Sequence, residues 1–342
     1  MMLPRTANAD ALQARAVLVA WRSRLMQGLA IGLALGISVG CSTMPGGGQP
    51  SVIAAERSAV PTPTTMPAAI AGARQVELPV SGAGRHQAGS IIAWQFEPVV
   101  SPGASATRAA VVALHGCGGL YDRQGQLSAR HRMAVDRLIA QGFVVLMPDS
   151  FGPRGLREIC SRGYRDRRID IAQRRLDTLA ALAHLSEREG IGRDRIALLG
   201  WSNGGTTVLA MIDATVATGA GATPAGFARA IAFYPGCGAA LRERARPAVP
   251  VLLLLGAEDD WTPARLCEQW ANETRGPGLP AIEVEVYAGA HHGFDGPGST
   301  PVRRTDVPHA PDGRGVTTGG HPQARRLSWE RVGDWLRPLT RP

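Results

Sequence analysis

One stretch of the chain, residues 196–205, constrains the fold most, because an apolar run there leads into a serine flanked by glycines. The apolar run favours a buried strand, and the apolar residues that follow Ser202 favour a helix. A serine at such a corner has a strained backbone, and glycines beside it let strand and helix pass closely enough to expose the hydroxyl. Gly200 and Gly204 occupy those positions. Glycine-rich patterns arise by chance in a chain with 42 glycines, so it is the strand and helix context that makes Ser202 the candidate nucleophile.

A nucleophilic serine requires a carboxylate that orients its base, and an acidic loop follows a later predicted strand. The continuous apolar run 250–255 is typical of a buried parallel strand, and it leads into Glu258, Asp259 and Asp260. In open α/β sheets, functional residues lie at this end of the strands. Asp259 is expected to point toward the neighbouring loop, whereas Asp260 is expected to face away and cap a helix that begins near Pro263. Asp259 is therefore the candidate acid, although an acidic cluster after a strand also suits a solvated helix start.

The base would come from a pair of histidines farther along the chain. Residues 282–287 alternate between apolar and polar, as in a strand with one buried face, and His291 and His292 follow in the next loop. His292 directly precedes Gly293, whose small size lets the loop turn tightly over Ser202. We expect His291 to point toward solvent or to pack at the base of the loop. His292 is therefore the candidate base.

A developing oxyanion requires backbone N–H groups that point at it. A further apolar run ends in His115-Gly-Cys-Gly-Gly, where the glycines leave backbone N–H groups free to turn toward such a charge. We assign the two donors to the N–H groups of Cys117 and of Asn203, the residue after the nucleophile, with Gly116 as the alternative to Cys117. Cys117 beside His115 is also an alternative nucleophile, but no elbow and no ordered acid and base accompany it.

These segments, together with Pro148-Asp-Ser-Phe, resemble the dienelactone hydrolase family of α/β-hydrolases over residues 75–342. The resemblance implies that Ser202 is the nucleophile, Asp259 the acid and His292 the base, without a metal or an organic cofactor. The enzyme after which the family is named uses a cysteine nucleophile, where this chain has a serine. We expect a serine hydrolase that cleaves an ester, lactone or thioester of a small molecule through an acyl-enzyme. The alternatives are a peptidase or acyltransferase on the same scaffold, and a non-catalytic binding protein anchored in the cell envelope.

Strands and helices alternate along most of residues 75–342, which predicts right-handed crossovers and a mostly parallel sheet. We expect an α/β protein with the α/β-hydrolase fold, in which helices flank a sheet of eight strands in one domain. We also expect the protein to be a monomer. The first two strands can form an antiparallel edge. The strands are expected near residues 75–80, 90–96, 109–114, 143–148, 195–199, 229–234, 250–255 and 282–287. The helices are expected near residues 127–141, 166–187, 203–217, 263–273 and 323–337.

Residues 1–41 have the composition of an export signal. Two arginines precede the apolar run 25–40, which ends at Cys41 and is short for a membrane-spanning helix. The sequence around Cys41 resembles a bacterial lipoprotein cleavage site, which implies acylation of this cysteine and, because Ser42 is not an aspartate, sorting to the outer membrane. An ordinary signal peptide and an uncut signal anchor are the alternatives. Residues 42–74 are rich in Pro, Ala, Thr and Gly and are predicted to be a flexible tether that leaves the enzyme domain in the periplasm.

Export would place the other four cysteines in an oxidising compartment, where three pairings are possible. Cys237 and Cys267 follow the ends of neighbouring predicted strands, and we expect a disulfide between them. No two of the four have the close spacing of metal ligands. The glycine-rich segment 116–119 has neither the Rossmann spacing nor a P-loop lysine, so no cofactor is expected. The four cysteines are Cys117, Cys160, Cys237 and Cys267.

The net charge of +9 reflects 37 arginines, since the chain contains no lysine. The arginines are dispersed, and we expect most of them to pair with acids or to lie on exposed helix faces, such as residues 165–175. This distribution argues against nucleic-acid binding, which needs a basic patch. Arg154 could anchor a substrate carboxylate, but a surface position is the simpler interpretation.

Overall fold

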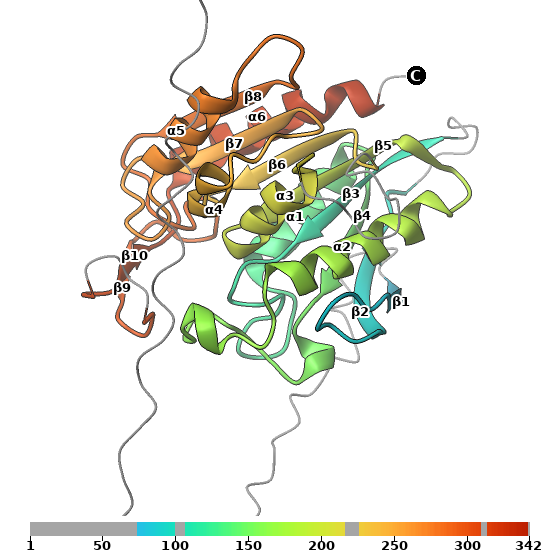
Figure 1. Cartoon of the computed structure of the whole chain (residues 1–342), viewed down its shortest axis with the longest axis horizontal. Coiled ribbons are helices and arrows are strands. Elements are labelled where there is room, and N and C mark those ends of the chain that lie inside the picture. Colours follow the sequence, from blue (N-terminus) through green and yellow to red (C-terminus); the bar gives the residue numbers. More distant parts are fainter. Residues whose placement is uncertain (1–73, 100–106, 216–225, 309–312, 341–342) are drawn as a thin grey trace, which may run out of the picture. The chain divides into compact units, whose positions relative to one another are not determined.

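The computed structural model describes residues 74–99, 107–215, 226–308 and 313–340. The predicted signal peptide with Cys41, and the predicted tether except for its last residue, lie outside the described residues. An eight-stranded sheet forms the centre of the described part (Figure 1). Its strands are β1 (Arg74–Val80), β2 (Gly89–Phe96), β3 (Arg108–Leu114), β4 (Val144–Asp149), β5 (Ile191–Trp201), β6 (Arg229–Phe233), β7 (Val251–Gly256) and β8 (Ile282–Tyr287). They follow the order β1-β2-β4-β3-β5-β6-β7-β8 across the sheet.

The direction of pairing changes once across the sheet. β1 pairs with β2, and β2 with β4, in antiparallel fashion, and all further pairs of this sheet are parallel. The predictions of a mostly parallel eight-stranded sheet and of an antiparallel edge are therefore confirmed. The registers bring the carboxyl ends of the parallel strands together, with Leu114 opposite Gly200 and Trp201 opposite Phe233. The loops after these strands meet at that edge.

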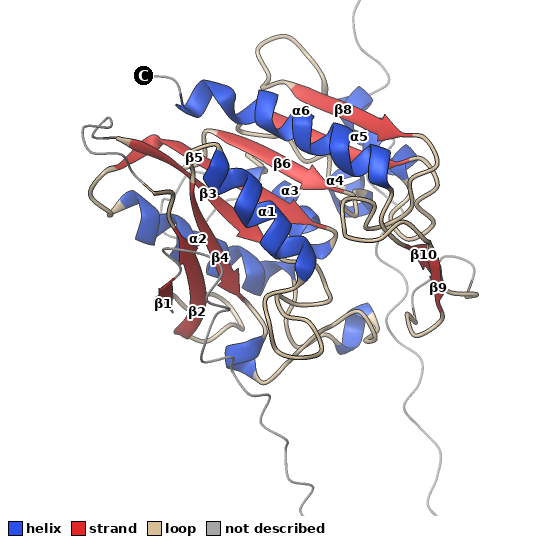
Figure 2. Ribbon diagram, turned by 180° about the vertical axis from the view of Figure 1, so that it is seen from behind, coloured by secondary structure: helices blue, strands red, loops and turns tan. Residues whose placement is uncertain are grey.

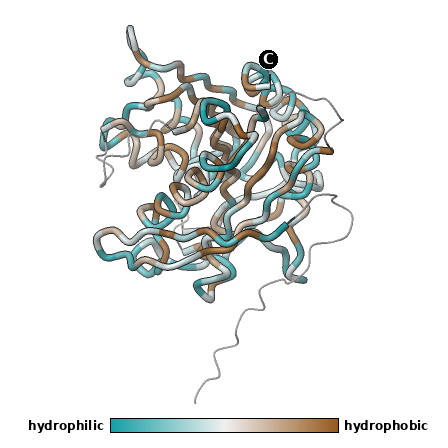
Figure 3. Tube along the Cα trace, turned by 90° about the vertical axis from the view of Figure 1, so that its right-hand side faces the viewer, coloured by the Kyte–Doolittle hydropathy of each residue, from teal (hydrophilic) through white to brown (hydrophobic). Residues whose placement is uncertain are grey.

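Helices cover both faces of the sheet (Figure 2). In the described part they are α1 (Ala129–Ala140), α2 (Ile171–Ser186), α3 (Asn203–Ile212), α4 (Gly238–Arg242), α5 (Ala264–Thr274) and α6 (Pro322–Thr340). α1 and α6 pack on one face, and α2, α3, α4 and α5 pack on the other. Successive strand residues point to opposite faces, so Val111 packs with α1 and α6 while Val112 packs with the other group. In Figure 3 the strands appear as apolar segments in the interior.

Polar side chains determine two helix ends, the start of α2 and the end of α3, that the apolar pattern of the sequence places at other residues. Asp170 accepts a hydrogen bond from the Gln173 N–H at 2.9 Å, and this cap starts α2. The prediction that the helix begins near residue 166 is therefore wrong. α3 also ends earlier than predicted, because the Asp213 carboxylate accepts the Thr215 N–H at 2.9 Å and turns the chain. Among the described residues, no helix combines the length and the apolarity needed to cross a bilayer.

A two-stranded hairpin, β9 (Val302–Arg304) with β10 (Val316–Thr318), lies outside the main sheet and is absent from the predicted elements. The Asp260 carboxylate accepts a hydrogen bond from the Thr317 N–H at 2.7 Å and fastens the hairpin to the loop after β7. α5 begins after Pro263 without a side-chain cap, so the prediction that Asp260 caps this helix is wrong. The Asp260 carboxylate therefore binds the hairpin and not the first turn of α5.

Candidate active site

Ser202 lies at the corner between β5 and α3 with φ 51° and ψ −116°, a backbone conformation that non-glycine residues rarely adopt. Its N–H donates a hydrogen bond to the Phe233 carbonyl oxygen at 2.9 Å, which ties the corner to β6. A Cβ at Gly200 would lie 2.4 Å from the Gly204 carbonyl oxygen, and one at Gly204 would lie 2.2 Å from that of Leu114. Backbone contacts therefore require both glycines, as the sequence predicts for a nucleophile elbow.

His292 lies between Ser202 and Asp259 and contacts both. Its Nε2 is 2.9 Å from the Ser202 Oγ, and its Nδ1 is 2.8 Å from the Asp259 Oδ2. The Asp259 carboxylate also accepts the N–H groups of Trp261 and Thr262, at 2.9 and 2.8 Å. Burial alone would raise the pKa of Asp259, but His292 and these hydrogen bonds lower it below its usual value. An ionised Asp259 can accept the Nδ1–H of His292 and leave Nε2 to accept the Ser202 hydroxyl proton.

The residues adjacent to this acid and this histidine are directed elsewhere. His291 donates from Nδ1 to the Glu258 carbonyl oxygen at 2.9 Å, so its ring packs at the base of the loop. Asp260 holds the hairpin, where it accepts the Thr317 N–H and pairs with Arg303, both at 2.7 Å. Of the two adjacent histidines, His292 is the one that contacts Ser202, and of the two adjacent aspartates, Asp259 is the one that contacts His292.

A buried carboxylate three residues after the histidine supports its loop. Asp295 accepts the Trp201 Nε1–H at 2.7 Å and the Tyr234 hydroxyl proton, and it lies 3.3 Å from the Arg130 Nε. Burial raises the pKa of Tyr234 well above its usual value, so the hydroxyl stays protonated and donates. The Tyr234 ring centre is 4.6 Å from that of His292. The sequence pattern does not predict this group, although Asp295 follows His292 by three residues.

The residues that carry the two predicted oxyanion donors, Cys117 and Asn203, line the same pocket as Ser202. The Asn203 N–H lies in the first turn of α3, where N–H groups have no partner within the helix. The direction of the Cys117 N–H is set by the carbonyl before it, because the C=O and N–H of a trans peptide point in opposite directions. That carbonyl, of Gly116, accepts the Nδ1–H of His115 at 2.8 Å. A Cβ at Gly116 would lie 3.5 Å from the Ser202 Cβ, so the loop packs directly on the elbow.

His115 is buried and connects this oxyanion loop, residues 115–119, to the end of β4. Its Nε2 accepts the Ser150 N–H at 3.2 Å, while its Nδ1–H is donated to Gly116. Burial and the positive charge of Arg174 hold the pKa of His115 well below its usual value. A neutral imidazole donates with one nitrogen and accepts with the other, which is what both contacts require.

Two disulfides join segments near the site. Cys237–Cys267, with Cα atoms 5.1 Å apart, confirms the predicted pairing. Cys117–Cys160, with Cα atoms 5.0 Å apart, joins the oxyanion loop to the segment after β4. The Ile159 N–H adds a hydrogen bond to the Cys117 carbonyl oxygen at 2.8 Å. A disulfide-bonded Cys117 has no free thiol, which rules out the alternative in which it is the nucleophile.

The structure places two arginines in surroundings that differ from the predicted ones. Arg174 is 1% exposed and does not lie on an exposed helix face. It donates from Nη1 to the Asn203 Oδ1 at 2.7 Å and from Nη2 to the His115 carbonyl oxygen at 2.6 Å. Burial lowers the pKa of Arg174 to about 10, so the guanidinium stays charged at neutral pH. Arg154 is not a free surface side chain or a carboxylate anchor for substrate, because it donates two hydrogen bonds, at 2.8 and 2.7 Å, to the buried Asp177.

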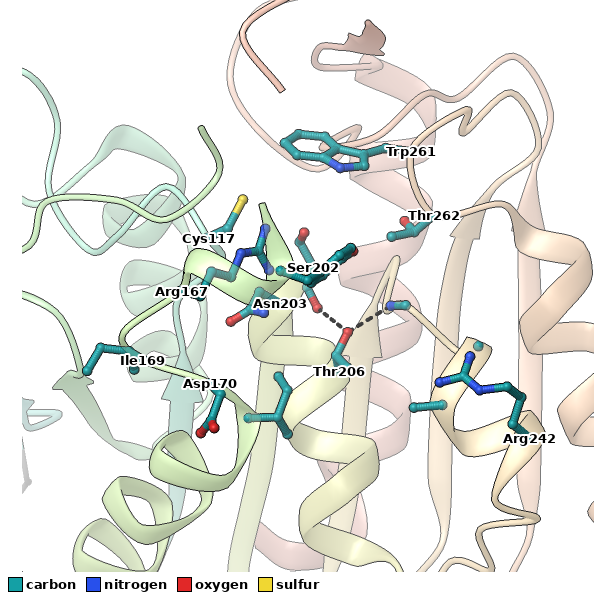
Figure 4. A pocket seen from close by; sticks show the side chains of 15 residues that line it. Cys117, Arg167, Ile169, Asp170, Ser202, Asn203, Thr206, Arg242, Trp261 and Thr262 are labelled. Atoms are coloured by element: carbon teal, nitrogen blue, oxygen red, sulfur yellow. Dashed lines mark hydrogen bonds between the residues drawn. The ribbon is translucent and has the colours of Figure 1, made fainter. Parts of the chain in front are cut away.

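Ser202 faces a pocket of about 470 Å³ (Figure 4). In this view Arg167 stands on one side of the serine, and Arg242 lies on the opposite side. The Trp261 ring also lines the pocket, with its centre 4.7 Å from that of His292. Apolar side chains and glycines form much of the remaining wall, namely Cys117, Ile169, Ile171, Gly236, Gly238 and Ala239.

Comparisons with known proteins show the fold and the family of this chain. A comparison with curated protein sequences gave no match. Esterase 2 of Thermogutta terrifontis, phosphoramylated by tabun, has the same fold, with a TM-score of 0.54 and 17% identity over 80% of this chain and 97% of the esterase. A dienelactone hydrolase-like promiscuous phosphotriesterase from metagenomic libraries has a TM-score of 0.51 and 19% identity over 78% of this chain and 99% of its own. The model of the dienelactone hydrolase family matches residues 98–340, and the chain therefore belongs to the dienelactone hydrolase family.

Proposed function

We propose that this chain is a serine hydrolase that cleaves an ester, lactone or thioester of a small molecule through an acyl-enzyme. The observation that carries the proposal is the pair of hydrogen bonds that runs from the Ser202 Oγ through His292 to Asp259, beside a pocket. Membership of the family and the fold of the esterases support a hydrolase. A serine hydroxyl is a weak nucleophile, and such a base and acid activate it.

In the first half of the reaction, the Ser202 Oγ attacks the substrate carbonyl carbon while His292 Nε2 takes the hydroxyl proton. Asp259 holds the imidazole in the required tautomer and stabilises the imidazolium. The carbonyl oxygen becomes an oxyanion that accepts the backbone N–H groups of Cys117 and Asn203. When this intermediate collapses, the bond to the alcohol or thiol leaving group breaks, that group takes the proton from His292, and the acyl group remains on Ser202.

In the second half, water attacks the acyl carbon and gives its proton to His292. The second oxyanion collapses, the bond to the Ser202 Oγ breaks, and the serine recovers its proton from the imidazolium. One ester and one water thus give one acid and one alcohol, and a lactone gives a single hydroxy acid.

The pocket suggests which substrates to try first. Its volume of about 470 Å³ falls within the range of small-molecule sites. Esterase 2 of T. terrifontis is known with propionate bound and with butyrate bound. Short acyl esters, such as p-nitrophenyl butyrate, are therefore the first choice for this chain.

Labelling with a fluorophosphonate tests the proposal directly. We expect the purified protein to be labelled at Ser202 and to hydrolyse p-nitrophenyl butyrate, and we expect Ser202→Ala to do neither. A clear preference for peptide anilides over esters would instead indicate a peptidase. Absence of both labelling and turnover would indicate a non-catalytic binding protein.

We also propose that the enzyme is exported and held in the cell envelope through an acylated Cys41. The two disulfides support this, because disulfides persist in oxidising compartments. The arginines and the apolar run that precede Cys41 supply the matching export signal.

A further inference from the structure

A buried arginine on α2 connects the two segments that carry the proposed oxyanion donors. Arg174 donates to the Asn203 Oδ1 at 2.7 Å and to the His115 carbonyl oxygen at 2.6 Å. Its Nε has no hydrogen-bond partner among the described residues, and the Phe151 ring centre lies 5.4 Å from its guanidinium carbon. Building on the proposed function, we propose that Arg174 is a positioning residue that holds both halves of the oxyanion hole and places a positive charge behind it.

The two hydrogen bonds of Arg174 control different donors. The His115 carbonyl begins the oxyanion loop, two residues before the Cys117 N–H. Asn203 carries its donor N–H on the backbone and the acceptor for Arg174 on its side chain. Displacement of a catalytic group by about 1 Å can cost about 10²-fold in rate. A planar guanidinium, with donors in a fixed fork, is suited to hold two acceptors at a constant separation, whereas a lysine ammonium is not.

The charge of this guanidinium is placed to act on the oxyanion. Both acceptors of Arg174 are neutral groups. The nearby acids have other donors: Arg154 binds Asp177 through two hydrogen bonds, and Asp149 accepts two backbone N–H groups. Inside the protein a charge acts more strongly than in water. The guanidinium therefore stabilises a negative charge that develops beside Asn203 more than it stabilises the neutral ground-state carbonyl.

Substitution of Arg174 tests the inference in the full-length enzyme. With p-nitrophenyl butyrate, Arg174→Met should lower kcat about 100-fold, similar to the loss of an oxyanion donor, while KM changes less than about threefold. Arg174→Lys keeps the charge without the fork and should fall between this variant and the wild type. Arg175→Met is the matched control on the same helix, because Arg175 is near Asp213 at the far end of α3. It should keep the wild-type kcat.

Asn203→Ala tests the same link from the other side, and it keeps the proposal testable if Arg174→Met does not fold. The alanine removes the acceptor of Arg174 but leaves the backbone N–H in place. We expect a decrease in kcat of about tenfold. Because both changes break one link, the double variant should be no slower than Arg174→Met alone.

A trifluoromethyl ketone separates positioning from general destabilisation. Its adduct with Ser202 places an alkoxide in the oxyanion hole, so its Ki should weaken in parallel with kcat in both Arg174→Met and Asn203→Ala. A merely structural role would reduce the fraction of sites that a fluorophosphonate titrates, without changing kcat per titrated site or Ki.

The outcomes distinguish this inference from the function on which it rests. Wild-type protein without Ser202-dependent turnover would overturn both. Ser202-dependent turnover together with wild-type kcat and Ki in Arg174→Met, or in Asn203→Ala if the first variant does not fold, would overturn the role of Arg174 alone.

Discussion

Asp259 and Asp260 are adjacent and chemically identical, but their partners differ, and so should the effects of replacing them. Asp259→Asn no longer selects the required imidazole tautomer and should lower kcat by about 10⁴. Asp260→Asn keeps an acceptor for the Thr317 N–H and should retain activity within about tenfold. Turnover of p-nitrophenyl butyrate by the two folded variants measures the difference.

The two histidines offer the parallel comparison. His292→Ala removes the base and should lower kcat by several orders of magnitude, whereas His291→Ala loses a contact to a backbone carbonyl and should remain active. If Asp260→Asn or His291→Ala is instead the inactive member of its pair, the assignment of acid or base is wrong.

His131 should make the stability of the protein depend on pH. Burial lowers its pKa to about 4 in the folded state, against about 6.5 in the unfolded chain. As pH falls, His131 therefore binds a proton in the unfolded chain before it does so in the folded protein, and this favours unfolding. The free energy of unfolding should fall by up to about 3 kcal/mol as pH drops from about 6.5 to 4. Urea unfolding at several pH values measures this slope.

His131→Gln provides the control for this slope. The variant should be less stable at pH 7, because the contact with Leu120 changes, but its stability should depend less on pH in the same interval. His115 contributes with the same sign, so part of the slope should remain. An unchanged slope would show that His131 does not carry the effect.

At the residue scale, the sequence predicts side chains that stand directly after a recognisable strand. Ser202, Asp259 and His292 could be proposed because the apolar runs before them were plain. Arg174 could not, because an arginine on a helix gives no sign of burial by itself. Its contact with His115 spans 59 residues, and that separation closes only when α2 packs on the sheet.

The two disulfides fasten different elements and should differ in what their loss costs. Cys237→Ser with Cys267→Ser opens a tie between α4 and α5 and should lower the free energy of unfolding by about 3 kcal/mol, with kcat retained. Cys117→Ser with Cys160→Ser should lower the free energy of unfolding by a similar amount. It should also reduce kcat by about tenfold or more, because the oxyanion loop is then no longer tied to the segment after β4.

Both quantities should be measured on the same preparations, with urea unfolding for stability and fluorophosphonate titration to count active sites. Equal kcat per titrated site in the two double variants would mean that the Cys117–Cys160 tie does not position the loop. A large loss of kcat in the variant without Cys237 and Cys267 would mean that this disulfide is needed to position the α4 residues that line the pocket.

The helices and strands differ in how well the local sequence predicts them. The eight strands were predictable because buried parallel strands are nearly continuous apolar runs. Helix ends were not, since Asp170 and Asp213 end the pattern through single hydrogen bonds. The hairpin of β9 and β10 has three residues in each strand and depends on Asp260, 57 residues from its partner Thr317, so no local pattern could reveal it.

For the molecule as a whole, the expected location can be tested by metabolic labelling. Cells that express the protein and receive labelled palmitate should yield labelled protein in the membrane fraction, because an acylated Cys41 partitions into lipid. Cys41→Ser should abolish the label and either release the protein or leave it as an uncleaved precursor. If the wild-type protein is unlabelled and freely soluble, Cys41 is not acylated and the leader is an ordinary signal peptide.

The whole fold brings together a site whose parts are spread from His115 to Asp295. The alternation of strands and helices made the fold predictable, and the order of Ser202, Asp259 and His292 along the chain indicated three residues of the proposed site. The pocket wall was not, because it depends on how the segment before α2 and the segment around α4 fold back over the elbow. Those segments include Arg167 and Arg242, whose positions follow from tertiary packing rather than from any repeat in the sequence.

The ring of Trp261, centred 4.7 Å from that of His292, gives the protein an internal optical probe. The mechanism turns a neutral imidazole into a cation whenever a tetrahedral adduct is present, and an imidazolium close to an indole quenches its fluorescence. Stopped-flow emission should therefore report the charge on His292 within a single turnover, and Trp261→Phe identifies the contribution of this one fluorophore among the six tryptophans that follow Cys41.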